Sequence, residues 1–301
     1  MRETTKGALL VFGAASGFGT IGIFGEFAVR IDLALATLLP VRFTVASAVV
    51  VGIAVARGWS VPRGRAAWTT LSLGVVYTAM TVLFFASLRH LTAGLAVILL
   101  FTYPAFVFVL SVRFLDEIVT RRTVAALALA LAGVALASAS DVAGGEPVGV
   151  ALAMGAAVCY AIYTTGSRAV VDEVTPSGLL VGVLLGTTAS MILWGASTAG
   201  LALPAVPREW GVTLGLALFG TVVPLLLFYE GVERLAASRV SVVSTAEPVV
   251  TVTLGVLLLD EPLTPAVVVS GVLVLGGALL VQREAGGEEL PTAREPVAGE
   301  E

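Results

Sequence analysis

The sequence predicts an all-α integral membrane protein whose ten transmembrane helices form two inverted five-helix repeats around a central cavity. Three observations predict this architecture. The composition is 57% hydrophobic and only 13% charged, which is typical of a chain folded in a bilayer. Apolar runs of about 18 or more residues without a charge recur along the chain, and each is long enough to cross a bilayer. The second half of the sequence also repeats features of the first.

The apolar runs define ten predicted spans. They lie near residues 7–26, 33–56, 67–88, 92–114, 121–139, 148–168, 177–200, 210–232, 237–259 and 264–282. The first span is rich in glycine and is followed by further spans, so we expect it to belong to the mature structure rather than to a cleaved signal peptide.

The distribution of arginine and lysine orients these spans, because cations beside a span resist translocation and remain cytoplasmic. If the N-terminus is cytoplasmic, most cations fall on the same side, and the exceptions are Arg30, Arg89 and Arg208. An odd number of spans would scatter the same arginines over both faces. We therefore expect a multi-pass protein of the plasma (inner) membrane with both termini in the cytoplasm.

An internal repeat supports the division into halves. Residues 88–120 align without a gap on residues 232–264 at an offset of 144. The aligned pairs are Leu91 with Leu235, Pro104 with Pro248, Asp116 with Asp260, Glu117 with Glu261 and Thr120 with Thr264, and nearer the start of each half Gly7 aligns with Gly149 and Gly13 with Gly155. Because five spans is an odd number, the second half must lie inverted in the membrane relative to the first, as in many secondary transporters.

The repeat predicts three regions. Residues 1–140 form the first five-helix repeat, residues 146–283 form the second, inverted repeat, and residues 284–301 form an acidic cytoplasmic tail whose composition suits disorder.

Several classes of site can be set aside by composition. The single Cys159 and the single His90 provide neither a disulfide nor the ligand cluster of a zinc site, so we expect no metal, no cofactor and no enzymatic activity. Gly17, Gly19 and Gly22 match a dinucleotide-binding pattern, but they lie within a predicted span, without the strand that this motif requires. Close packing of helices is the better interpretation. We expect no nucleic-acid partner.

Two prolines near the middle of their spans direct attention to the residues before them. Pro104 and Pro248 each remove a backbone hydrogen bond and can kink a helix. Tyr103 and Glu247 then lie near the membrane midplane. Burying an unpaired carboxylate there costs a few kcal/mol, so Glu247 should face the protein interior and carry a proton or hold a partner. A structural ion pair or support of the kink is the alternative to a functional role.

Arg42 is the other deeply placed charge. It lies about nine residues into the second predicted span, where snorkelling to the surface is strained. Three interpretations stay open. Arg42 is the partner of Glu247, it contacts the substrate, or it pairs with Glu26 and ties the first two spans together.

Aromatic residues complete the predicted cavity. Tyr77 and Phe84 are seven residues apart, and Tyr160 and Tyr163 are three apart, so each pair shares a helical face. Core packing or an interfacial aromatic belt is an equal alternative for each of them. The predicted substrate-binding residues are Arg42, Tyr77, Phe84, Tyr103, Tyr160, Tyr163, Tyr229 and Glu247, with helix kinks at Pro104 and Pro248.

Three motifs carry a family resemblance. They are FASLRHLTAG at residues 85–94, AEP at residues 246–248 and LLDEPLT at residues 258–264. With these motifs the chain from about residue 7 to residue 282 resembles the drug/metabolite transporter superfamily, EamA family, and is similar to bacterial exporters of aromatic amino acids and other metabolites. The resemblance implies eight helices around a central cavity, the fifth and tenth helices at the periphery, and transport by alternating access.

We therefore expect a secondary transporter that exports amino acids or similar small neutral or zwitterionic metabolites. The predicted cavity lacks the clustered Lys and Arg that phosphate binding requires. The predicted partners are a small-molecule substrate, the lipid bilayer and, as a candidate coupling ion, a proton. Two alternatives stay open. One is an exporter of hydrophobic cations or drugs with Glu247 as counter-charge, and the other is a membrane scaffold or lipid-handling protein that transports nothing.

Overall fold

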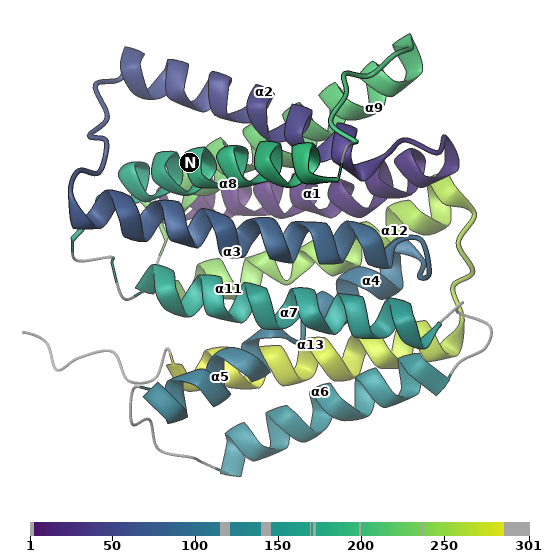
Figure 1. Cartoon of the computed structure of the whole chain (residues 1–301). Helices are drawn as coiled ribbons and strands as arrows, with labels where there is room; N and C mark the ends of the chain where they lie inside the picture. Colours follow the sequence, from purple (N-terminus) through teal and green to yellow (C-terminus); the bar gives the residue numbers. More distant parts are fainter. Residues whose placement is uncertain are drawn as a thin grey trace, which may run out of the picture.

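The computed structural model describes residues 3–114, 121–139, 146–168, 170, 173–198, 200–235 and 237–285, and these residues form helices and short connections without a strand. Most helices run side by side in one bundle (Figure 1). The helices are α1 (Glu3–Arg30), α2 (Leu35–Ala56), α3 (Arg65–Ser87), α4 (Ala93–Leu100), α5 (Tyr103–Phe114), α6 (Arg121–Ala139), α7 (Pro147–Arg168), α8 (Pro176–Ser197), α9 (Pro207–Ala217), a π-helical segment (Leu218–Val222), α10 (Val223–Val232), α11 (Ala237–Ser244), α12 (Ala246–Leu259) and α13 (Pro265–Ala285).

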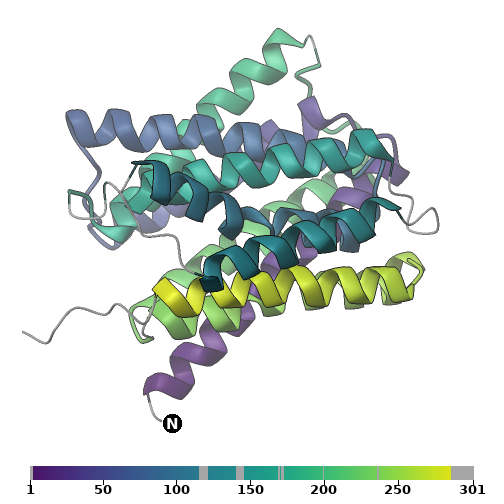
Figure 2. The same cartoon turned by 90° about the horizontal axis from the view of Figure 1, so that it is seen from below.

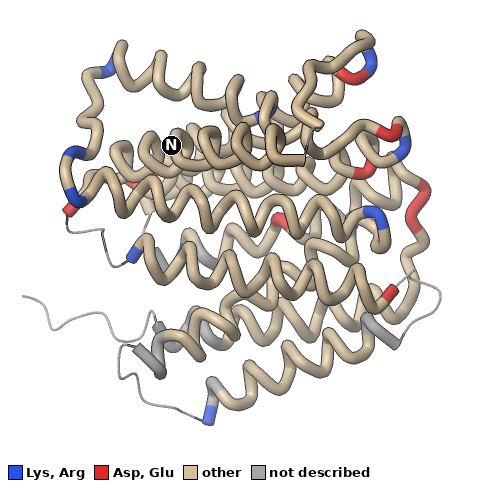
Figure 3. The backbone as a smooth tube through the Cα atoms, viewed as in Figure 1, with Lys and Arg blue, Asp and Glu red and all other residues tan. Residues whose placement is uncertain are grey.

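The lengths and compositions of these helices suit a bilayer. Eight helical segments of the described chain are long and apolar enough to span a membrane, and two shorter apolar helices cover Val124–Leu136 and Pro265–Leu280. Lys, Arg, Asp and Glu gather mainly at the ends of the helices and in the connections between them (Figure 3). The predicted all-helical membrane protein is confirmed. Asp116, Glu117 and residues 286–301 of the predicted tail lie outside the described residues.

Two spans are broken near their middle, and the breaks lie at equivalent positions of the sequence repeat. The first separates α4 from α5 at residues 101–102, and the second separates α11 from α12 at residue 245. Pro104 and Pro248 are both buried and lie in the first turn of the helix that follows each break. A proline is tolerated there because the first N–H groups of a helix have no intrahelical acceptor.

At each break a threonine side chain adds a second hydrogen bond to a carbonyl that already accepts from the backbone amide of the same threonine. The hydroxyl of Thr102 donates to the carbonyl of Leu99 at 2.7 Å, and the hydroxyl of Thr245 donates to the carbonyl of Val242 at 2.6 Å. Each break therefore recovers locally part of the hydrogen bonding that it removes from the helix.

The two halves of the chain make matched contacts with each other. Helix α1 packs against α10 and α12, and α7 packs against α3 and α5. A Cβ atom on Gly13 would lie 3.3 Å from Cδ1 of Leu227, and one on Gly155 would lie 3.3 Å from Cδ1 of Leu83. Leu83 and Leu227 differ by the same offset as the aligned prolines. At one edge of the bundle, α6 and α13 lie side by side (Figures 1 and 2).

Glycines allow the helices to approach at backbone distance. A Cβ atom on Gly74 of α3 would lie 2.5 Å from the amide nitrogen of Thr187 on α8, and one on Gly186 would lie 2.8 Å from Cα of Leu71. On α1, a Cβ atom on Gly19 would lie 2.9 Å from Cγ1 of Val250. The glycines of the dinucleotide-like pattern thus serve helix packing. Gly211 has open space around it instead.

The crossing of α3 and α8 gives a test of this packing. The change Gly186→Ala places a methyl group against the backbone of Leu71, and such overpacking costs about 1–3 kcal/mol of stability. We expect the midpoint of thermal unfolding in detergent to fall. The matched control is Gly211→Ala, where nothing lies within 4 Å and alanine favours the helix. Equal midpoints for the two variants would contradict the close crossing.

Candidate functional site

Four tyrosines form one aromatic cluster, called here the tyrosine cluster, between α3, α5 and α7. The ring centroids of Tyr103 and Tyr160 are 4.4 Å apart, and those of Tyr77 and Tyr163 are 5.2 Å apart. Tyr160 and Tyr163 join the two pairs, with centroids 6.1 Å apart and planes only 9° from parallel. The structure therefore brings together four of the residues that the sequence singled out individually.

The helix break places Tyr103 in this cluster. Tyr103 is the first residue of α5, directly after the break, and its ring packs against Phe101 with centroids 6.0 Å apart. Tyr160 and Tyr163 lie three residues apart on α7 and so share a face of that helix. Tyr77 extends the cluster onto α3 and packs edge to face on Phe43 of α2, with centroids 6.1 Å apart.

Glu247 lies beside the tyrosine cluster at the second helix break. It is half-buried in the first turn of α12, and it interacts electrostatically with Tyr77, Tyr103 and Tyr160. The partial positive charge of a helix N-terminus favours a carboxylate at this position. The ion pairs found in the described part of the chain do not include Glu247.

Arg42 lies deep in the bundle with only neutral neighbours. Its side chain is 2% exposed. Its Nε atom donates to the hydroxyl of Thr221 at 2.8 Å, and its Nη2 atom donates to the carbonyl of Gly220 at 3.5 Å. The guanidinium carbon lies 4.8 Å from the ring centroid of Phe43 and 5.5 Å from that of Phe85. Within the described residues, Nη1 has no hydrogen-bond partner.

The interpretation that pairs Arg42 with Glu26 is wrong. Glu26 instead forms an ion pair with Arg30, at 3.1 Å from Nε. Arg30 lies one helical turn after Glu26 on α1, so this pair forms without any contribution from α2.

Two of the predicted residues lie apart from the tyrosine cluster. Phe84 is 5% exposed and packs on Phe85 with ring centroids 5.8 Å apart. Tyr229 packs on Trp59 at 5.2 Å, beside the ion pair between Arg57 and Glu230. Phe84 therefore contributes to the packing behind Arg42, whereas Tyr229 lies at a helix end.

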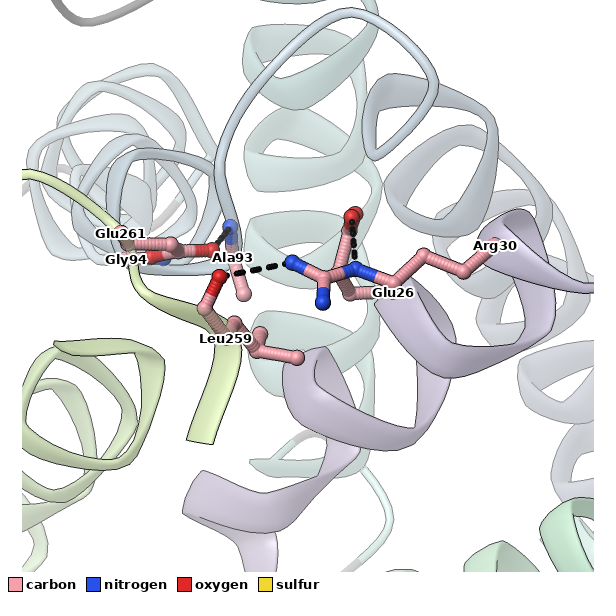
Figure 4. Close-up of polar contacts among 6 residues, drawn as sticks. All are labelled: Glu26, Arg30, Ala93, Gly94, Leu259 and Glu261. Carbon is pink, nitrogen blue, oxygen red and sulfur yellow. Dashed lines mark hydrogen bonds and ion pairs between the residues drawn. The ribbon is translucent and has the colours of Figure 1, made fainter. Parts of the chain in front are cut away.

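A polar junction joins α1, α4 and α12 at one end of the bundle, and we call it the Glu261 junction (Figure 4). The carboxylate of Glu261 accepts hydrogen bonds from the amides of Ala93 and Gly94, at 2.7 and 3.2 Å, and so caps the N-terminus of α4. Nearby, Nη2 of Arg30 donates to the carbonyl of Leu259 at 2.7 Å, at the C-terminus of α12. The N-terminus of α4 and the C-terminus of α12 meet here, and each is held by a side chain from a distant segment of the chain.

The C-terminus of α12 sets the position of Glu261. Asp260 adopts a left-handed conformation with φ of 56°, and the amide of Glu261 returns to the carbonyl of Gly255 at 3.1 Å. A Cβ atom on Gly255 would lie 2.9 Å from Cδ of Glu261. Burial raises the pKa of Glu261, and the hydrogen bonds from Ala93 and Gly94 partly oppose this shift. The internal repeat aligned Glu261 with Glu117, but no pattern in the sequence indicated that Glu261 caps α4.

The described residues contain no group of three or more His, Cys, Asp and Glu that could hold a metal ion. The site consists of aromatic rings, one carboxylate and one guanidinium. Groups of these kinds can bind a small polar or charged organic molecule through cation–π contacts, hydrogen bonds and ion pairs.

Broken helices inside a bundle of apolar spans are a feature of many membrane transporters, and the family match assigns the chain to that class. Residues 5–139 and 147–283 each match the EamA-like transporter family, and the chain belongs to that family. It is 33% identical over 202 residues to an uncharacterized transporter of Archaeoglobus fulgidus, covering 65% of this chain and 70% of the relative. It is 30% identical over 229 residues to the threonine/homoserine exporter RhtA of Escherichia coli, covering 73% and 74% respectively.

A solved crystal structure has a similar fold. It covers 96% of this chain and 100% of its own, with a TM-score of 0.64 and 23% sequence identity. The likeness concerns the course of the backbone over nearly the whole chain.

The Glu261 junction gives the second test. The change Glu261→Ala removes both acceptors from the first amides of α4, and loss of a helix cap costs about 1–2 kcal/mol. We expect a lower midpoint of thermal unfolding for the purified protein in detergent. Glu173→Ala is the matched control because Glu173 is exposed. The assignment fails if Glu261→Ala and Glu173→Ala unfold at the same temperature.

Proposed function

We propose that this chain is a secondary transporter that exports amino acids or similar small neutral or zwitterionic metabolites by alternating access. The observation that carries the proposal is the tyrosine cluster that Tyr103 joins directly after the first helix break, with Glu247 directly after the matching second break. Membership of the EamA-like transporter family and the likeness to a threonine/homoserine exporter support an amino acid as the substrate.

In this proposal the chain consists of two inverted repeats, residues 1–140 and 146–283, with both termini in the cytoplasm. Three observations support it. The family matches each half separately, the helix breaks recur at one offset, and α1 and α7 make matched contacts through Gly13 and Gly155. Inverted repeats allow the same site to open to either side when one half rocks against the other.

The substrate site of the proposal is the tyrosine cluster together with Glu247. An ammonium group binds well to a carboxylate and to the faces of tyrosine rings. The helix breaks at residues 101–102 and 245 provide hinges close to the bound solute. The chain can change direction at such a break without rupturing the hydrogen bonds of a continuous helix.

The Glu261 junction is then the outer closure of the transport path. The positive-inside distribution of cations supports this end of the bundle as the outer one. Release of an exported solute requires α1, α4 and α12 to separate there. The hydrogen bonds from Ala93 and Gly94 to Glu261, and from Arg30 to Leu259, are the contacts that break.

Export of hydrophobic cations is the second candidate. The feature that favours it is the combination of several aromatic rings with Glu247, whose carboxylate forms no ion pair with a described residue. A lipophilic cation would use the same rings and the same carboxylate.

Transport in proteoliposomes tests the proposal. Purified protein should catalyse counterflow of radiolabelled threonine or homoserine, and an excess of a lipophilic cation should not compete. Glu247→Gln removes the charge while keeping the size of the side chain, and we expect flux to fall about tenfold or more, since a hydrogen bond to a charged group contributes about 1.5–3 kcal/mol.

The matched control is Tyr229→Phe, because Tyr229 packs on Trp59 away from the tyrosine cluster. Its flux should remain within about twofold of the wild type. The proposal fails if no amino acid shows counterflow. The role of Glu247 fails if Glu247→Gln transports as fast as the wild type.

A further inference from the structure

We propose that Arg42 is the receptor for a carboxylate group of the transported solute. This inference rests on the proposed export function and names the substrate class more narrowly. It assigns the carboxylate-binding group to a helix pair, α2 and the π-helical segment, that lies beside the tyrosine cluster.

The first argument is the burial of Arg42 without a counter-charge. Only 2% of its side chain is exposed, and its hydrogen bonds go to a hydroxyl and a carbonyl, both of which are neutral. A guanidinium held for structure alone normally pairs with a carboxylate, because an unpaired buried charge costs several kcal/mol. Glu26, which the sequence offered as a counter-charge for Arg42, forms an ion pair with Arg30 instead.

The second argument is that the protein accepts hydrogen bonds from two nitrogens of the guanidinium and provides no acceptor for the third. Nε is bound to Thr221 and Nη2 to Gly220, whereas Nη1 has no hydrogen-bond partner in the described chain. The rings of Phe43 and Phe85 flank the group. A guanidinium fixed in this way keeps a free donor for a planar anion such as a carboxylate.

The third argument is the rare backbone conformation that holds Arg42. Residues 218–222 form a π-helical segment, and the hydroxyl of Thr221 donates to the carbonyl of Leu216, five residues earlier, at 3.1 Å. That donation leaves the oxygen lone pairs of Thr221 to accept from Arg42. Single-turn π-helices inside α-helices occur frequently at functional sites.

The fourth argument is the aromatic surface that connects Arg42 with the tyrosine cluster. The ring of Phe43 flanks the guanidinium, and Tyr77 packs on Phe43 and on Tyr163 of the cluster. The faces of tyrosine rings attract an ammonium group, so the surface beside Arg42 suits the cation of an amino acid whose carboxylate binds Arg42. A hydrophobic cation offers Arg42 no anion.

Competition on the wild-type protein tests the inference without a mutation. Counterflow of radiolabelled threonine is measured in proteoliposomes with excess unlabelled threonine, threonine amide or threoninol, the last two of which keep the ammonium group but lack the carboxylate. We expect both analogues to compete about tenfold or more weakly than threonine, since one charge-assisted hydrogen bond is lost.

A variant then assigns the discrimination to Arg42. Arg42→Gln should raise KM for threonine about tenfold or more and should make threonine and its amide compete equally. Arg42→Lys keeps the charge and should retain part of the preference for the carboxylate. Arg57→Gln is the matched control, because Arg57 is exposed and pairs with Glu230. If Arg42 had only a structural role, Arg42→Gln would lower flux but leave the preference for threonine over its amide unchanged.

The outcomes separate the two proposals. Absence of any amino-acid counterflow in the wild type overturns the proposed function and this inference with it. Counterflow in which the amide competes as well as threonine overturns the inference alone. So does an Arg42→Gln protein that transports threonine and still prefers the carboxylate.

Discussion

The lack of water at bilayer depth is the constraint on which this structure depends. A backbone or charged group there must find its partners within the protein. The two broken helices satisfy this requirement in the same way, with buried prolines after each break and a threonine hydroxyl covering a carbonyl before it. Tyr103, beside the first break, belongs to the tyrosine cluster, and Glu247, beside the second break, is half-buried and interacts electrostatically with that cluster.

The same constraint explains why two charges inside the bundle are informative. Within the described residues, the ion pairs include neither Arg42 nor Glu247. Each is therefore held in the bundle by neutral groups, at a cost that a charged partner would offset. At the end of the bundle, by contrast, Glu261 and Arg30 bind helix termini and close the structure. In the proposed function the interior charges are left for a ligand, whereas the outer ones hold helix ends.

Much of this arrangement could be predicted from the sequence because hydropathy and repetition act locally. Composition predicted the helical membrane fold, and the aligned prolines pointed to the two positions at which the helices break. The contacts of individual charges could not be predicted. Glu26 pairs with Arg30 on its own helix rather than with Arg42, and Glu261 caps a helix 168 residues away in the chain. The π-helical segment that holds Arg42 has no signal in the periodicity of the sequence. Tyr229 was grouped with the other tyrosines by residue type, but the course of α10 places it beside Trp59.

An experimental structure of the protein with a bound amino acid tests the central claim most directly. The account predicts that the solute lies against the tyrosine cluster, with its carboxylate on Nη1 of Arg42. A solute bound at another place in the bundle, with the tyrosine cluster closed and Arg42 without a ligand, would contradict the account.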